Sequence, residues 1–176
     1  MFDSNDIDIT VRNADEGDLE KLIGLYKSVI GAAFCAWDEF YPTEEIITRD
    51  ILDKNLYVFE NEDGRIDGAF AIDRDEDIAS LSCWRKKEEC YGEISRLVVR
   101  PSVQGMGIAG KLLRCGMNEL CRRGFERVRF LVAAKNLPAV RAYNKIGFEK
   151  VGSTTLFDID FYCYERELDL VGGVGE

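Results

Sequence analysis

The chain has 176 residues, of which 46% are hydrophobic and 32% charged, a composition typical of one soluble globular domain with a sizeable core. Its net charge of −10 argues against nucleic acid and anionic membranes as partners, because both select basic surfaces. The absence of histidine excludes Ser-His and Cys-His catalysis and metal binding by imidazole. The six cysteines form no Cys-x-x-Cys pair, so we expect reduced, mostly buried thiols and no metal site.

The first residues, Met1 to Asp6, are acidic and polar, which is not the pattern of a signal peptide. No apolar run approaches the roughly 20 residues that a membrane-spanning helix requires. We therefore expect a cytoplasmic protein with one domain over residues 1–170 and a disordered tail over residues 171–176.

The first half of the chain predicts a strand, two helices and a hairpin. Apolar and polar residues alternate over 7–12, which indicates a strand, and helices are expected after the capping residues Asp15 and Thr43. Two strands, 56–59 and 66–72, flank the turn sequence Asn61-Glu62-Asp63-Gly64. The charged segment 73–89 is expected to be irregular.

The second half predicts four strands and two helices, with one helix after each of the first two strands. Strands are expected at 94–99 and 127–132, and a long helix at 107–123 ends at Gly124. A short helix begins at Pro138 and runs to Lys145, because proline is favoured in the first turn. The last two strands are expected at 148–152 and 160–168.

The most informative segment is residues 104–110, Gln-Gly-Met-Gly-Ile-Ala-Gly, which lies between the 94–99 strand and the long helix. Three glycines let a backbone turn tightly and approach a bound anion, and a helix N-terminus adds partial positive charge. The segment therefore predicts a cradle for phosphate or pyrophosphate. An ordinary tight turn is the alternative.

Two common phosphate-binding motifs do not account for this cradle. Its spacing formally matches the dinucleotide fingerprint Gly-x-Gly-x-x-Gly, but that site also needs an acidic residue at the end of the next strand. Here that strand ends in Leu131-Val132-Ala133-Ala134. A P-loop is excluded as well, because no Gly-Lys-Ser/Thr sequence follows.

A pair of motifs indicates a different family. After the 94–99 strand the chain reads Gln104-x-x-Gly107-x-Ala109, and further on it reads Asn136-x-x-Ala139-x-x-x-Tyr143-x-x-x-Gly147-Phe148. In both motifs the chain resembles the GNAT superfamily of N-acetyltransferases, sharply over residues 93–152 and more loosely before them. The resemblance implies one GNAT-like α/β domain (α+β type). Its mixed, mostly antiparallel central sheet would have about six to seven strands and about four flanking helices.

The resemblance also implies acetyl-CoA as the co-substrate. Backbone groups of the glycine loop would bind its pyrophosphate, and the preceding strand would pair with its pantetheine arm. Met106 stands where the family often has a basic residue, so binding would depend on the backbone and the helix dipole. For Asn136, a helix cap is the alternative to a pantetheine contact. The implied cofactor-binding residues are Leu97, Val98, Val99, Gln104, Gly105, Met106, Gly107, Ile108, Ala109, Gly110, Asn136, Ala139 and Tyr143.

Two residues are implied as catalytic. Tyr143 would protonate the departing thiolate, and a core tyrosine is the alternative reading. Glu93 would act as general base, directly or through water; alternation places it on the face of Ser95 and Leu97. A solvated carboxylate is the alternative there, with Glu88 and Glu89 as adjacent fallbacks.

The resulting interpretation is an acetyl-CoA-dependent N-acetyltransferase that transfers the acetyl group directly to an amine in a ternary complex, without a metal. The acceptor is a small-molecule or peptide amine, with Trp37, Phe40, Tyr41 and Trp84 either lining its pocket or packing in the core. A non-catalytic acyl-CoA-binding module, and an acyltransferase for longer chains or hydroxyl acceptors, are the alternatives. Monomer and homodimer both remain open.

Overall fold

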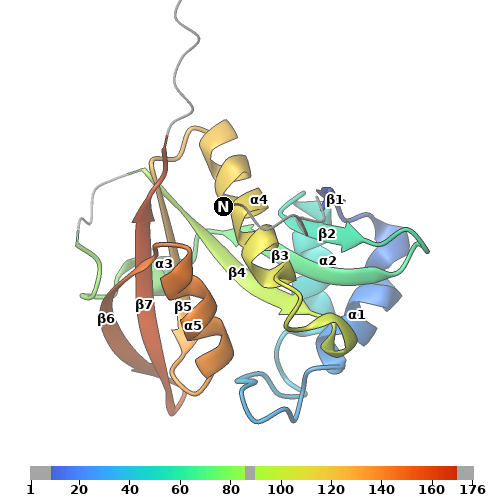
Figure 1. The fold of residues 1–176 in the computed structure, drawn as a ribbon, viewed down its shortest axis with the longest axis horizontal. Helices are drawn as coiled ribbons and strands as arrows, with labels where there is room; N and C mark the ends of the chain where they lie inside the picture. The colour runs from blue at the N-terminus through green and yellow to red at the C-terminus, as the bar shows by residue number, and fades with distance from the viewer. Residues whose placement is uncertain (1–8, 86–89, 170–176) are drawn as a thin grey trace, which may run out of the picture.

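The computed structural model describes residues 9–85 and 90–169. They form five α-helices and one seven-stranded sheet (Figure 1). In chain order the elements are β1 (Val11–Asn13), α1 (Leu19–Lys27), α2 (Glu44–Leu52), β2 (Leu56–Glu60), β3 (Ile66–Asp73), α3 (Glu76–Ala79), β4 (Tyr91–Val99), α4 (Ile108–Arg122), β5 (Arg127–Ala133), α5 (Leu137–Lys145), β6 (Glu149–Leu156) and β7 (Ile159–Glu167).

The strand order is β1-β2-β3-β4-β5-β7-β6, and every neighbouring pair is antiparallel except β4 and β5, which run parallel. The parallel pair is joined through α4, as a parallel connection requires. This is the mixed, mostly antiparallel sheet expected from the sequence.

The two faces of the sheet carry separate hydrophobic clusters. Side chains of α1 and α2, including Leu22 and Ile47, pack on one face with Ala69 and Ala71 of β3. Side chains of α4 and α5 pack on the other face, where Phe70 is fully buried. Figure 1 shows the same division, with α4 and α5 on one side of the sheet and α1 and α2 on the other. Alternation assigns residues 69–73 of β3 to the two faces, but it does not extend to Ile66, because the register with β2 shifts there.

The predicted elements all exist, with shifted ends. The strand expected to begin at Ile94 begins at Tyr91, so Glu93 lies inside the strand and not at its opening. A fifth helix, α3, forms within the segment expected to be irregular, because the Asp75 carboxylate accepts hydrogen bonds from two backbone N–H groups of its first turn. Residues 7–8, Glu88, Glu89 and the 171–176 tail lie outside the described residues.

Strict alternation along β4 is wrong beyond Ser95. The register shifts between Ala69 and Ala71 of β3, because two β4 residues, Arg96 and Leu97, stand opposite Phe70. Arg96 has a φ of 48°, which is unusual for a residue with a side chain and marks a β-bulge. As a consequence Val98, and not Leu97, shares the sheet face of Glu93 and Ser95.

No helix among the described residues has the length and apolarity needed to cross a bilayer.

Two helical glycines provide a matched test of the packing. A Cβ added at Gly116 in α4 would lie 2.7 Å from Ile94 Cδ1, so Gly116→Ala is expected to destabilise the fold by about 1–3 kcal/mol through overpacking. A Cβ added at Gly24 in α1 would meet nothing within 4 Å, so Gly24→Ala is expected to stabilise the fold by about 0.5–1 kcal/mol. Urea denaturation of both variants measures the two changes. Equal effects would contradict this packing of α4.

Candidate active site

The parallel strands β4 and β5 pair over three residues only. Tyr91, Gly92 and Glu93 face the first three residues of β5, and beyond Glu93 the described part of β4 pairs with β3 alone. The rest of β5 continues alongside β7 up to Ala133. Figure 1 shows β4 diverging from β5 and β7. The divergence leaves the backbone of β4 open on its β5 side for the second half of its length.

The hydrogen-bond pattern shows which backbone groups face this open edge. The Arg100 N–H donates to the Asp67 carbonyl at 2.8 Å, so this pair is hydrogen-bonded across the strands. Hydrogen-bonded and non-hydrogen-bonded pairs alternate in an antiparallel ladder. Val98 therefore bonds to β3, whereas the backbone groups of Leu97 and Val99 point to the open edge. The Val99 carbonyl already accepts a hydrogen bond from Gln104 Nε2 at 3.0 Å, so the Val99 N–H is the group that it offers to a ligand at this edge.

The open edge leads directly into the glycine loop. Gly105 and Gly107 have φ values of 80° and 79°, a conformation that only glycine adopts without strain. A Cβ added at either position would meet nothing within 4 Å, so the space over this backbone is free of the protein's own side chains. Their conformation and the free space above them are those expected of a cradle for a bound group.

The N-terminus of α4 adds hydrogen-bond donors to the loop. Its N-cap residue, Gly107, has no side chain to cap the first turn, and the Lys111 N–H is the one that bonds back to the Gly107 carbonyl, at 3.2 Å. The N–H groups of Ile108, Ala109 and Gly110 have no acceptor inside the helix, and they lie at its positive end. Met106 is 60% exposed and brings no charge.

The second motif forms the start of α5. Asn136 is the N-cap of this helix, and its Oδ1 accepts from the Ala139 N–H at 3.2 Å. The capping role weighed for Asn136 is therefore present. The cap uses the carbonyl oxygen of the side chain and leaves its amide N–H groups for a second partner. Ala139 is partly buried against the α4 and α5 cluster.

Tyr143 lies one turn further along α5 and is 7% exposed. Its ring contacts Phe130 of β5 edge-on, with the ring centroids 5.0 Å apart, next to Phe148 and Tyr164. Burial raises the pKa of the phenol, so it holds its proton at neutral pH. The side chain is thus both a core residue and a protonated hydroxyl beside the strand that borders the open edge.

Glu93 is 2% exposed although it carries an ionisable group. Burial, and then the neighbouring carboxylates Asp73 and Asp75, raise the pKa of Glu93 to about 8, against the opposing effects of the Asp75 N–H and Arg96. The Asp75 N–H donates to Glu93 Oε2 at 3.3 Å. A carboxyl group that titrates near neutral pH at the end of the paired segment is suited to move protons.

One further charged group, Arg96, could not be recognised from local sequence patterns. Its side chain is 7% exposed and bonds to both oxygens of Asp50 on α2, at 2.7 and 3.0 Å, and to Asp73 Oδ2 at 2.9 Å. Its carbonyl accepts from the Tyr26 hydroxyl at 2.9 Å. An isolated arginine in an apolar strand suggests only an exposed charge; the bulge that turns it inward has no sequence signature of its own.

The aromatic residues considered for an acceptor pocket separate into two groups. Trp84 is buried, with its indole N–H on the Ile78 carbonyl, and Trp37 packs edge-on against Tyr26. Phe40 and Tyr41 lie exposed in the loop before α2, and the Tyr41 hydroxyl lies 3.3 Å from Arg96 Nη1. Phe40 and Tyr41 are thus the exposed pair, Trp37 is partly buried, and Trp84 belongs to the packed interior.

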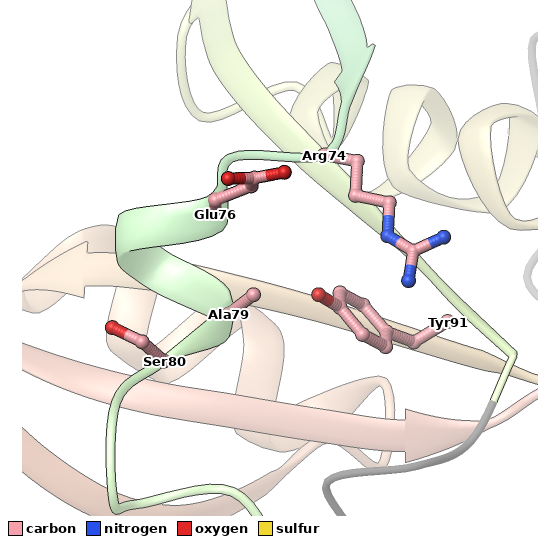
Figure 2. Close-up of a pocket in the computed structure, with 5 residues that line it drawn as sticks. All are labelled: Arg74, Glu76, Ala79, Ser80 and Tyr91. Atoms are coloured by element: carbon pink, nitrogen blue, oxygen red, sulfur yellow. The ribbon is translucent and has the colours of Figure 1, made fainter.

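Two surface pockets lie apart from the glycine loop. One, of about 480 Å³, lies between α3 and the start of β4 and is shown in Figure 2, with the Arg74 guanidinium over the Tyr91 ring. The other, of about 380 Å³, lies along the β6–β7 hairpin. The first adjoins the segment that holds Glu93, since Asp75 lies between two of its lining residues. Among the described residues no cluster of three or more Cys, Asp or Glu side chains could hold a metal ion.

The sequence profile described as the Acetyltransferase (GNAT) family matches residues 25–148. The chain belongs to this family. The match includes the open edge of β4, the glycine loop, and α5 with Asn136 and Tyr143.

Individual relatives are consistent with this assignment. A mycothiol acetyltransferase from Brachybacterium faecium is 33% identical over 133 residues, which cover 72% of this chain and 37% of that protein. The chain spans about a fifth to a third of the length of the first curated relatives it matches.

Solved structures show the same fold. A GNAT-family acetyltransferase from Streptococcus agalactiae has a TM-score of 0.76 at 18% identity, over 92% of this chain and 96% of that one. The yncA protein from Salmonella typhimurium, solved with its cofactor acetyl-CoA, has a TM-score of 0.71 at 20% identity, over 95% and 98%.

Gly107→Val is expected to weaken acetyl-CoA binding at least about tenfold, because the side chain fills the free space and distorts the donors of the loop. Gly124→Val is the matched control. Gly124 follows the opposite end of α4, has a φ of 86° and also has open space around it, so its substitution introduces the same kind of strain. Calorimetric titration of both folded variants measures the difference. Unchanged affinity in Gly107→Val, or equal loss in both, would contradict the cradle.

Proposed function

We propose that the protein is an acetyl-CoA-dependent N-acetyltransferase that transfers the acetyl group directly to a bound amine. The observation that carries the proposal is the continuity of the open edge of β4 with the uncapped N-terminus of α4. An extended chain can add to a free strand edge, and an anion can bind where that edge meets a helix N-terminus. Acetyl-CoA has both parts in that order.

The residues present fit the cofactor. The N–H groups from Gly107 to Gly110 would bind its pyrophosphate, and the backbone groups of Leu97 and Val99 would bond to the amides of its pantetheine arm. The Asn136 side chain is oriented by its capping bond, and its amide N–H groups would be donors for the pantetheine arm. When bound, acetyl-CoA supplies an acetyl group activated as a thioester, and a strand N–H at the open edge would polarise the carbonyl.

Glu93 serves as the general base in this proposal. An amine is protonated at neutral pH and must lose a proton before it can attack a thioester. The Glu93 carboxylate would take that proton, directly or through one bound water, because it lies on β4 where pairing with β5 ends. Its raised pKa makes it a stronger base than an exposed glutamate, once ionised.

Tyr143 serves as the general acid. Its buried phenol keeps its proton at neutral pH and would give it to the departing thiolate. The four-residue spacing places the small side chain of Ala139 on the same helix face, which leaves room for a sulfur atom beside the hydroxyl.

The acceptor is proposed to be a primary amine of a small molecule or peptide. The matched relatives are named mycothiol acetyltransferases, which favours a small-molecule acceptor. The acidic groups around Glu93 favour an acceptor that arrives as a cation.

Incubation with acetyl-CoA and a panel of primary amines, followed by mass spectrometry of the products, tests the activity. Mass spectrometry avoids thiol-reactive dyes, which six cysteines would consume. Binding of acetyl-CoA without any acetylated product would favour a non-catalytic binding module.

The rate of acetylation is expected to rise with pH through a midpoint near 8, because Glu93 must be ionised to accept the proton. The measurement is kcat/KM against pH, with an acceptor whose own amine titrates well away from 8. Glu93→Gln is expected to lower kcat/KM by roughly a hundredfold and to remove this midpoint. The same midpoint in Glu93→Gln would exclude the residue as the base.

Tyr143→Phe is expected to lower kcat by roughly a hundredfold with little change in acetyl-CoA affinity, because it removes the proton donor and keeps the ring. Tyr164→Phe is the control, since its ring lies in the same aromatic cluster but its hydroxyl bonds to Asn144 at 3.2 Å. Steady-state kinetics and calorimetry separate turnover from binding. Equal turnover in wild type and Tyr143→Phe would remove Tyr143 from the mechanism.

A further inference from the structure

Two acidic side chains, one of them the proposed base, lie directly opposite one another on neighbouring strands. Asp73 of β3 and Glu93 of β4 are cross-strand partners, so their side chains project from the same face of the sheet. Like charges in this arrangement repel, and neither group is fully solvated, since Glu93 is 2% exposed and the Asp73 side chain 37%. A nearby cation would offset this repulsion.

Arg96 is that cation. Its Nη2 lies 2.9 Å from Asp73 Oδ2 and 3.0 Å from Asp50 Oδ1. Among the residues that the structure describes, two further charged groups lie near Glu93: Asp75, whose backbone N–H donates to the Glu93 carboxyl, and Arg129, the register partner of Glu93 on β5. Arg129 pairs with Glu165 and lies against the rings of Trp84 and Tyr91.

The bulge is what brings Arg96 to this face. In a regular strand Arg96 would share the side of Ile94, which packs in the α4 and α5 cluster. With its φ of 48°, the side chain instead reaches Asp50 on α2 and Asp73 on β3, both on the opposite side of the sheet. The bulge thus moves one charged side chain to the opposite face of the sheet, next to a proposed catalytic carboxyl. Bulges and strained backbone residues often lie beside active sites, where they redirect a side chain.

We propose that Arg96 is a positioning residue of the acceptor site, which compensates the charge of Asp73 and thereby sets the electrostatic field in which Glu93 exchanges its proton. This inference rests on the proposed role of Glu93 as the base. It assigns to Arg96 an action through Asp73 and no contact with the reacting atoms. A purely structural role, tying α2 to the sheet, would leave the titration of Glu93 unchanged.

The test measures the titration of Glu93 in the free protein, without acetyl-CoA or acceptor. Carboxyl ¹³C NMR of glutamate-labelled protein follows each group against pH, and Glu93→Gln assigns the signal. Asp73→Asn is expected to lower the Glu93 midpoint from near 8 by about one pH unit, because a facing negative charge is removed. Arg96 stays paired with Asp50 in this variant, so the fold is retained.

Substitution of Arg96 provides the opposite shift. Arg96→Met is expected to raise the Glu93 midpoint by a similar amount, and Arg96→Met combined with Asp73→Asn to return it to within about half a unit of wild type. Arg96→Lys keeps the charge and is expected to stay close to wild type. If Arg96→Met alone does not fold, the double variant is compared with Asp73→Asn alone; a higher Glu93 midpoint in the double variant supports the role of Arg96, and an equal midpoint contradicts it.

Asp67→Asn is the matched control. Asp67 also lies on β3, at the other end of the strand from Asp73, is 4% exposed, and also pairs with arginines, Arg65 and Arg100. Its substitution is expected to leave the Glu93 midpoint in place. An unshifted midpoint in Asp73→Asn, or an equal shift in Asp67→Asn, would overturn the role of Arg96. Because the readout needs no turnover, that result would leave the proposed acetyl transfer standing; conversely, loss of the Glu93 role in kinetics would leave the electrostatic result intact.

Discussion

The site depends on the unequal pairing of β4 with its two neighbouring strands. Backbone N–H and C=O groups in the middle of a sheet are normally bonded on both sides. Here β4 pairs with β3 from Glu93 to Val99 but with β5 over only three residues, and Leu97 and Val99 face an open edge. Both faces of the sheet remain packed by helices, so the strand stays rigid while one edge is free. The result is a preformed surface for an extended ligand, continuous with the donors at the start of α4.

The bulge at Arg96 adds chemistry to this edge. The bulge inserts one extra residue into β4, and pairing with β3 then continues to Val99, just before the glycine loop. The same distortion turns a guanidinium towards Asp50 and Asp73. A single backbone feature thus links the proposed cofactor edge to the charges around Glu93, and through Asp50 it also connects α2 to them.

The sequence predicted the elements, the glycine loop and the family, because each depends on local patterns. Periodicity located the strands and helices, and the Gln104 and Asn136 motifs have fixed spacing. Non-local features were beyond such reasoning. Alternation predicts Leu97 on the face of Glu93, but the bulge puts it on the opposite face. The burial of Arg96 depends on partners 46 and 23 residues away in the sequence. The short helix α3 was missed because its only local signal is the cap at Asp75.

The proposed activity requires the edge of β4 and the N-terminus of α4 to hold acetyl-CoA together. Titration of ¹⁵N-labelled protein with acetyl-CoA, followed by backbone amide NMR, tests it most directly. Saturable one-to-one shifts are expected at Leu97, Val99 and the amides of residues 107–110, with none for NAD⁺. Shifts confined to the pocket beside Tyr91 or to the β6–β7 hairpin, or no binding at all, would contradict it.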